Sequence, residues 1–185
     1  MLVSSLRSNT HNSLLSSCCN NFGTIKDFSE LMIRSLAQFP AEKDFSIVQF
    51  ATDASIVSRP QSANDALSTV QQLSYSGGVT NHAEAISSCR QSLSSSQIPG
   101  RKNFIMLITD GEPTAPENDP EGAATLAASQ AKKDGMFIIP IFISQTYTYD
   151  PFMSGLSSDG KVFDVTDFDG LLNLQEALVN QVSCS

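Results

Sequence analysis

The stretch Asn103-Phe104-Ile105-Met106-Leu107-Ile108-Thr109 is the part of the sequence that decides the fold. A nearly continuous apolar run of this length is typical of a parallel strand that is buried on both faces. Residues 136–143 form a second run of the same kind, although Pro140 inside it removes one backbone donor. Two such strands predict an α/β protein with a mainly parallel sheet.

Helical and strand patterns surround these two runs. Apolar residues recur at steps of three and four from Phe22 to Phe39, which predicts an amphipathic helix that ends before Pro40. Further helices are predicted over 66–73, 83–93, 120–134 and 171–182, and further strands over 45–51, 54–58 and 161–165. Residues 1–21 are rich in Ser and show no clear period, so we expect an irregular segment there, followed by one domain over 22–185.

The composition bounds the class of protein. The chain has 185 residues, 41% of them apolar, which suits one globular domain with a real core. Its formal net charge of −8 argues against a general nucleic-acid binder. No apolar run approaches the length of a membrane-spanning helix, and no secretory signal follows Arg7.

Two polar residues stand in loops that follow strands. Thr80 comes after the Gly77-Gly78 pair, whose backbone freedom allows close approach of a ligand, and Asp110 directly follows the strand over 103–109. In parallel sheets, ligands bind at the carboxyl ends of the strands, so we expect this hydroxyl and this carboxylate on one rim. The alternatives are that Thr80 caps the following helix and that Asp110 is an ordinary loop or capping residue.

Three stretches resemble one family. Residues 45–51, then Gly77-Gly78-Val79-Thr80-Asn81, then the strand that runs into Asp110-Gly111 are similar to the von Willebrand factor type A domain, which integrin I domains share. The resemblance covers residues 22–182 and implies a doubly wound sheet with helices on both faces. It also implies a metal-ion-dependent adhesion site, in which Thr80 and Asp110 match two of the ligand positions. The implied ion is Mg²⁺ or Mn²⁺, and it leaves one position open for an acidic side chain of a partner.

The first loop of that site departs from the family pattern. The family supplies an Asp and two Ser from a DxSxS motif, and counting back from Phe22 places these at Asn12, Leu14 and Ser16. Only Ser16 matches, and no acidic residue precedes Asp27. We therefore expect metal ligands Thr80, Asp110 and Ser16, with weak or absent metal binding.

The first strand raises a related question. In this fold it is central and apolar, but the candidates are Met1-Leu2-Val3 and Leu14-Leu15, both short. A missing central strand would lose roughly 10 kcal/mol of burial, against a total stability of about 5–15 kcal/mol. The first strand is therefore expected to be degenerate or missing, and we interpret this N-terminus as not the natural one.

The four cysteines give no further site. Cys18, Cys19, Cys89 and Cys184 fit no CxxC zinc pattern. A disulfide from Cys18 or Cys19 to Cys89 stays open, as do free thiols. Cys89 lies on the apolar face of a predicted helix, which favours a buried thiol over a nucleophile.

The leading functional hypothesis is a non-enzymatic binding or adhesion module. It would recognise a carboxylate of a protein or extracellular-matrix partner through the divalent cation, and the resemblance favours an extracellular or secreted location. The alternative is a metal-independent scaffold that assembles a protein complex. An enzyme, such as a hydrolase using Asp110, is not favoured because His11 and His82, the two histidines, form no nucleophile–base pattern.

Overall fold

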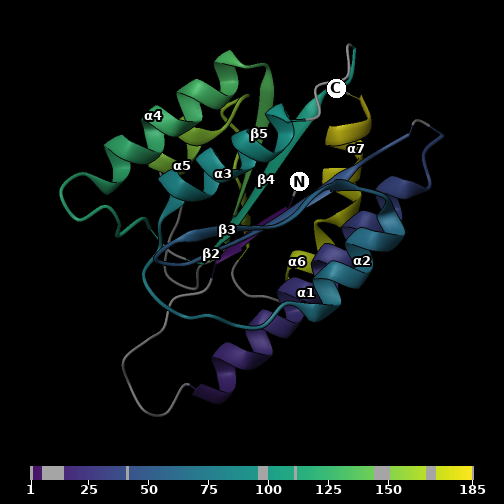
Figure 1. Cartoon of the computed structure of the whole chain (residues 1–185), viewed down its shortest axis with the longest axis horizontal. Coiled ribbons are helices and arrows are strands. Elements are labelled where there is room, and N and C mark those ends of the chain that lie inside the picture. Colours follow the sequence, from purple (N-terminus) through teal and green to yellow (C-terminus); the bar gives the residue numbers. More distant parts are fainter. Residues whose placement is uncertain are drawn as a thin grey trace.

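A six-stranded sheet forms the centre of the molecule (Figure 1). The computed structural model describes residues 2–5, 15–40, 42–95, 100–110, 112–143, 151–165 and 170–184. The strand order is β3-β2-β1-β4-β5-β6, and every neighbouring pair is parallel except β2 with β3. The prediction of a doubly wound, mainly parallel α/β fold is confirmed.

The elements follow the predicted patterns closely. The strands are β1 (Leu2–Ser5), β2 (Phe45–Phe50), β3 (Ala54–Gln61), β4 (Asn103–Thr109), β5 (Met136–Ile143) and β6 (Phe163–Val165). The helices are α1 (Leu15–Ala37), α2 (Ala63–Gln72), α3 (His82–Ser94), α4 (Pro120–Lys133), α5 (Pro151–Leu156), α6 (Gly170–Asn173) and α7 (Gln175–Cys184). The short helix α5 was not predicted from the sequence. Across the described ranges, no helix has both the length and the apolar character needed to cross a bilayer.

The helices cover the sheet on both faces. Figure 1 shows α3, α4 and α5 on one side and α1, α2, α6 and α7 on the other. Each face has its own apolar core, and alternate residues of β4 serve the two: Ile105 and Leu107 face α3 and α4, while Met106 and Ile108 face α1 and α7. This explains why β4 reads as a continuous apolar run.

The N-terminal segment differs from the expectation. A first strand exists, and its described span of four residues lies at the centre of the sheet between β2 and β4. Helix α1 begins at Leu15, before the predicted start at Phe22, so the expected irregular segment over 1–21 is wrong for residues 2–5 and 15–21. Two parallel neighbours supply hydrogen-bonding partners to a short strand, and no Pro or Gly interrupts the chain between Leu15 and Phe22.

The outer strands of the sheet are irregular or short. Opposite Phe45 and Ile47 of β2, the partners in β3 are Gln61 and Ser58, so β3 carries an extra residue in a bulge that contains Pro60. At the other edge, β6 has three residues in its described span. It pairs with β5 from Ile141 onward, so Pro140 precedes the pairing and needs no donor on that side.

Candidate metal site

Loops from separate parts of the chain meet where the central strands have their carboxyl ends. The loop before α3 is tied to the end of β2, because the Asn81 amide donates a hydrogen bond to the Ala51 carbonyl at 3.0 Å. It is also tied to the loop after β4, because the Thr114 amide donates to the Thr80 carbonyl at 2.8 Å. The structure therefore brings the loop of Thr80 into direct contact with the loop that begins at Asp110.

Thr80 is held firmly by its backbone and is fully buried, with 0% of its surface exposed. Its amide donates to Thr114 Oγ1 at 3.0 Å, and its carbonyl accepts from the amides of Thr114 and Ala115. Its hydroxyl is different: within the described part of the chain, Thr80 Oγ1 has no hydrogen-bond partner. Leaving a buried hydroxyl unpaired costs about 1–3 kcal/mol, which marks this oxygen as one that a ligand would satisfy.

The capping alternative for Thr80 is wrong. The cap of α3 is the next residue, Asn81, whose side-chain oxygen accepts a hydrogen bond from the Glu84 amide at 3.0 Å. Because Asn81 satisfies the free amide of the first turn, the helix does not use the hydroxyl of Thr80.

Asp110 directly follows β4 and is partly exposed. The preceding residue, Thr109, pairs with Ser5, the last residue of β1, so β1 ends beside the start of the Asp110 loop. Thr109 also shares a buried hydrogen bond with His82, the first residue of α3. Asp110 thus lies at the same edge of the sheet as Thr80.

Ser16 lies in the first turn of α1. Its side chain falls outside what the structure describes, as do Asn12 and Leu14, with which it was aligned. Ser16 therefore stays a prediction from sequence. The described span of β1 ends at Ser5, which gives a starting point for the first loop other than Phe22.

The Gly77-Gly78 pair adopts the unusual backbone angles expected, with φ of +62° and +117°. The close approach at Gly78 is made by the chain itself, because a Cβ there would lie 2.7 Å from Thr52 Oγ1. The glycines therefore let this loop pack against the end of β2, which fixes the course of the chain into Thr80.

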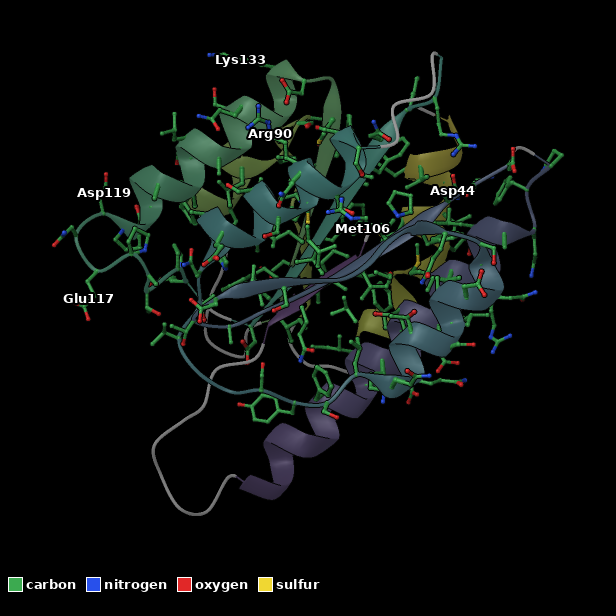
Figure 2. All side chains as sticks on the ribbon, in the orientation of Figure 1. Asp44, Arg90, Met106, Glu117, Asp119 and Lys133 are labelled. Atoms are coloured by element: carbon green, nitrogen blue, oxygen red, sulfur yellow. The ribbon has the colours of Figure 1, made fainter. Side chains whose placement is uncertain are left out.

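The acidic loop over 112–121 leads into α4 and supplies the cap residue of that helix. Asp119 caps that helix by accepting from the Gly122 amide at 3.0 Å, and Glu117 is exposed (Figure 2). Among the described residues, no group of three or more His, Cys, Asp or Glu side chains gathers to hold a metal ion. A metal at the rim would thus be held mainly by hydroxyl and single carboxylate ligands.

Cys89 is a buried free thiol in α3. Burial raises the pKa of the thiol well above its ordinary value, so it is not a reactive nucleophile. The open alternative of a disulfide from Cys18 or Cys19 to Cys89 is wrong for this structure.

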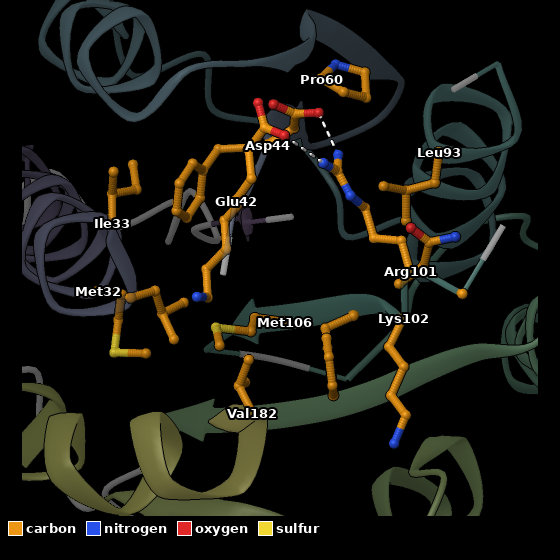
Figure 3. A pocket seen from close by; sticks show the side chains of 16 residues that line it. Met32, Ile33, Glu42, Asp44, Pro60, Leu93, Arg101, Lys102, Met106 and Val182 are labelled. Atoms are coloured by element: carbon orange, nitrogen blue, oxygen red, sulfur yellow. Dashed lines mark hydrogen bonds and ion pairs between the residues drawn. The ribbon is translucent and has the colours of Figure 1, made fainter. Parts of the chain in front are cut away.

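A separate pocket of about 280 Å³ lies at the opposite end of the sheet (Figure 3). Its apolar wall comes mainly from α1, the amino ends of β2 and β4, and α7: Met32, Ile33, Leu36, Phe45, Phe104, Met106 and Val182. At its rim, Arg101 pairs with Asp44 and with Glu42. This pocket contains neither Thr80 nor Asp110, so it is distinct from the candidate metal site.

The profile of the von Willebrand factor type A domain matches residues 16–177. Solved structures give the same picture of the fold. Proximal thread matrix protein 1 from the mussel byssus superposes with a TM-score of 0.77 at 18% identity, over 97% of this chain and 46% of that one. This chain therefore spans less than half the length of that protein. A further structure of the same mussel protein has a zinc-occupied MIDAS motif, with a TM-score of 0.75 at 17% identity, 97% of this chain and 46% of that one.

Two other structures are similar over most of this chain. The conserved hypothetical protein BatB from Bacteroides thetaiotaomicron has a TM-score of 0.70 at 18% identity, covering 98% of this chain and 96% of that one. The manganese-loaded TRAP protein of Plasmodium vivax has a TM-score of 0.65 at 17% identity, covering 96% and 72%. At these identities the similarity establishes the fold alone.

Proposed function

The chain belongs to the von Willebrand factor type A family, whose domains commonly mediate adhesion or protein interactions, and we propose that it is a non-enzymatic binding module of this kind. It recognises an acidic residue of a protein or extracellular-matrix partner through a divalent cation, Mg²⁺ or Mn²⁺. Thr80 and Asp110 hold the ion, with Ser16 as a third ligand. The location that fits this role is outside the cell or on its surface.

The observation that carries the proposal is the unpaired hydroxyl of Thr80. It is fully buried, and no described residue satisfies it. An oxygen of this kind, beside a loop that begins with a carboxylate, suits a hard cation such as Mg²⁺ or Mn²⁺. When bound, the ion supplies a positive charge that attracts an anionic group of the partner.

Charge explains why the cation would be needed. The chain has a formal net charge of −8, which disfavours the approach of an acidic partner. Hydroxyl ligands are neutral, so a divalent ion held by one carboxylate keeps about one unit of positive charge. Asp110 and Thr80 thus create a local site for a carboxylate on an otherwise acidic protein.

Metal titration with matched variants tests the proposal. We expect calorimetry with Mn²⁺ to show a weak site, because no acidic residue before Asp27 adds a second negative ligand. Thr80→Val, which keeps the shape, and Asp110→Asn should each abolish measurable binding, while Glu117→Gln in the exposed part of the loop should leave it unchanged. A micromolar site that survives Asp110→Ala would contradict the assignment of the ligands.

The partner class needs its own measurement. An immobilised peptide with a single exposed Glu should capture the protein in Mn²⁺ and release it in EDTA, whereas the same peptide with Gln should not capture it. Equal capture of both peptides would contradict recognition of a carboxylate.

The second candidate is a metal-independent scaffold within the same family. The lack of any Asp or Glu before Asp27 favours it, because the first loop then contributes no charged ligand. Partner binding that is unchanged in EDTA and in Asp110→Asn would support this scaffold over the metal-dependent module.

A further inference from the structure

His82 is a buried histidine whose position the proposed function does not explain. It is the first residue of α3, follows the cap residue Asn81, and has 0% of its surface exposed. Histidine is only intermediate in its tendency to be buried, and a polar ring in a core needs hydrogen-bond partners. Its place two residues after Thr80 puts it beside the candidate site.

Two aromatic side chains fix the plane of the His82 ring. Phe152 of α5 stacks on it with an interplanar angle of 7° and centroids 6.2 Å apart. Phe50, the last residue of β2, meets it edge-on at 68° and 6.0 Å. These contacts come from two different elements, β2 and α5, so the ring has little freedom to turn.

The fixed ring presents one nitrogen to the end of β4. His82 Nε2 and Thr109 Oγ1 share a buried hydrogen bond of 3.1 Å, across 27 residues of sequence. Thr109 is the last residue of β4 and directly precedes Asp110. The bond therefore links the helix that follows Thr80 to the strand end that carries Asp110.

Backbone hydrogen bonds make a second link between the same loops. Thr80 accepts from the amides of Thr114 and Ala115 and donates to Thr114 Oγ1. These bonds hold the far side of the Asp110 loop, whereas His82 holds its near side at Thr109. Together they bracket Asp110 between two attachments to the Thr80 loop.

We propose that His82 is a positioning residue that sets the placement of Asp110 relative to the Thr80 hydroxyl. It touches neither the cation nor the partner. It acts through its hydrogen bond to Thr109, so the geometry of the two ligands is fixed before an ion arrives. This inference rests on the proposed function for its metal-binding readout, but the loop geometry can be tested without metal.

Variants on both sides of the bond test the proposal. His82→Phe keeps an aromatic ring and removes the hydrogen bond, and Thr109→Val removes it from the other side with little change in shape. We expect each to weaken Mn²⁺ binding about tenfold, and the double variant to be no weaker than either single one, because both remove the same bond. His82→Gln, whose amide can replace Nε2, should retain binding within about threefold.

A control separates positioning from loss of stability. Ile105→Val lies in the buried, amino-terminal half of β4 and should lower the melting temperature without weakening Mn²⁺ binding. Mn²⁺ affinities of His82→Phe and Thr109→Val that match the parent protein would overturn the proposal. The proposal would also be overturned if Ile105→Val lost Mn²⁺ affinity in the same proportion to its fall in melting temperature as His82→Phe and Thr109→Val do.

A metal-free measurement distinguishes failure of this inference from failure of the proposed function. In EDTA, amide hydrogen exchange at Thr114 and Ala115 should accelerate about tenfold in His82→Phe and not in Ile105→Val. If the parent protein binds no Mn²⁺ but this acceleration occurs, the metal function fails and the positioning role stands. Exchange that is the same in His82→Phe and the parent protein overturns the positioning role.

Discussion

β1 and β4 are neighbours at the centre of one sheet, but their described spans differ in length. β4 has seven residues and supplies apolar side chains to both cores, whereas β1 has four residues in its described span. Within the described part of the chain, the four residues of β1 are enough to pair with both β2 and β4. The two strands also lead to different parts of the candidate site, because Asp110 directly follows β4, whereas the residues predicted for the first loop come after β1 in the sequence.

The largest effect is expected in the middle of β4. Leu107 is fully buried, and Leu107→Ala should lower the free energy of unfolding by about 2–5 kcal/mol, through lost burial and the cavity left behind. Urea denaturation would measure it. As the control, Leu126→Ala in α4, where the side chain is 61% exposed, should change stability by less than about 0.5 kcal/mol. Equal losses in the two variants would show that β4 is not the main support of the sheet.

A smaller gain is expected from lengthening β1 at its amino end. Leu2 pairs with Ile47 and Met106, but β2 starts earlier, at Phe45, and β4 at Asn103. The pocket of about 280 Å³ lies at these amino ends of β2 and β4. Val-Leu-Val added ahead of Met1 should stabilise the fold by roughly 2 kcal/mol, the value of burying one large aliphatic side chain.

Thermal unfolding of the extended protein would measure this gain. The matched control is Gly-Ser-Gly at the same place, which adds backbone without apolar side chains and should leave the melting temperature nearly unchanged. If both extensions act alike, the pocket does not accept a continuation of β1.

The first loop can be strengthened by adding the charge it lacks. Leu6 is the next residue in sequence after Ser5, which pairs with Thr109, just as Asp110 is the next after Thr109. If the proposed metal site exists, Leu6→Asp should raise Mn²⁺ affinity about tenfold, or about 1.4 kcal/mol, by adding a second carboxylate ligand. Calorimetry would compare it with Asn9→Asp, which adds the same charge in the same stretch. An equal gain from Asn9→Asp would indicate general electrostatic attraction instead.

The smallest expected effect concerns Asp159, which lies shortly before the edge strand β6 and forms hydrogen bonds with Ser157, Lys161 and Gln181. Burial disfavours the charged carboxylate, but hydrogen bonds from Gln181, the Lys161 amide and Ser157, together with the Lys161 charge, outweigh it and lower the pKa of Asp159. A lowered folded-state pKa means that this stabilisation is present above the unfolded-state pKa, near 3.9, and is lost as the pH falls through the folded-state value.

Asp159→Asn should therefore be less stable than the parent protein at pH 7, by under about 1 kcal/mol, with the difference disappearing at acid pH. Urea denaturation between pH 7 and pH 2.5 would measure it, with the exposed Glu117→Gln as the control. A stability difference that stays constant across this range would contradict the assigned role.

The fold could be predicted because the strands β4 and β5 can be recognised in the sequence as apolar runs. The apolar runs at β4 and β5 are longer than a loop would contain. The apolar residues from Phe22 to Phe39 recur with a helical period, which a loop would not show. β1 could not be predicted with the same clarity, because Leu2–Ser5 is too short for a period to show. What makes it a strand is pairing with β2 and β4, which is a tertiary effect.

The candidate site divides in the same way. Thr80 and Asp110 follow well-marked elements, and their loops meet as expected. The prediction of Ser16 depends on counting back from Phe22 as the start of the first helix. In the structure α1 begins at Leu15, so Phe22 is not the first residue of that helix. Counting forward from Ser5 directs attention to residues 6–14, which contain Ser8 and Thr10. His82 could not be predicted as a positioning residue, because no sequence pattern indicates its bond to Thr109.

The two edge strands of the sheet, β3 and β6, affect how copies of the protein behave when they are packed closely together. β3 is interrupted by a bulge that contains Pro60, and β6 has three residues in its described span, so neither described edge presents a long regular strand to another molecule. Many copies held close together would thus resist joining edge to edge into extended sheets.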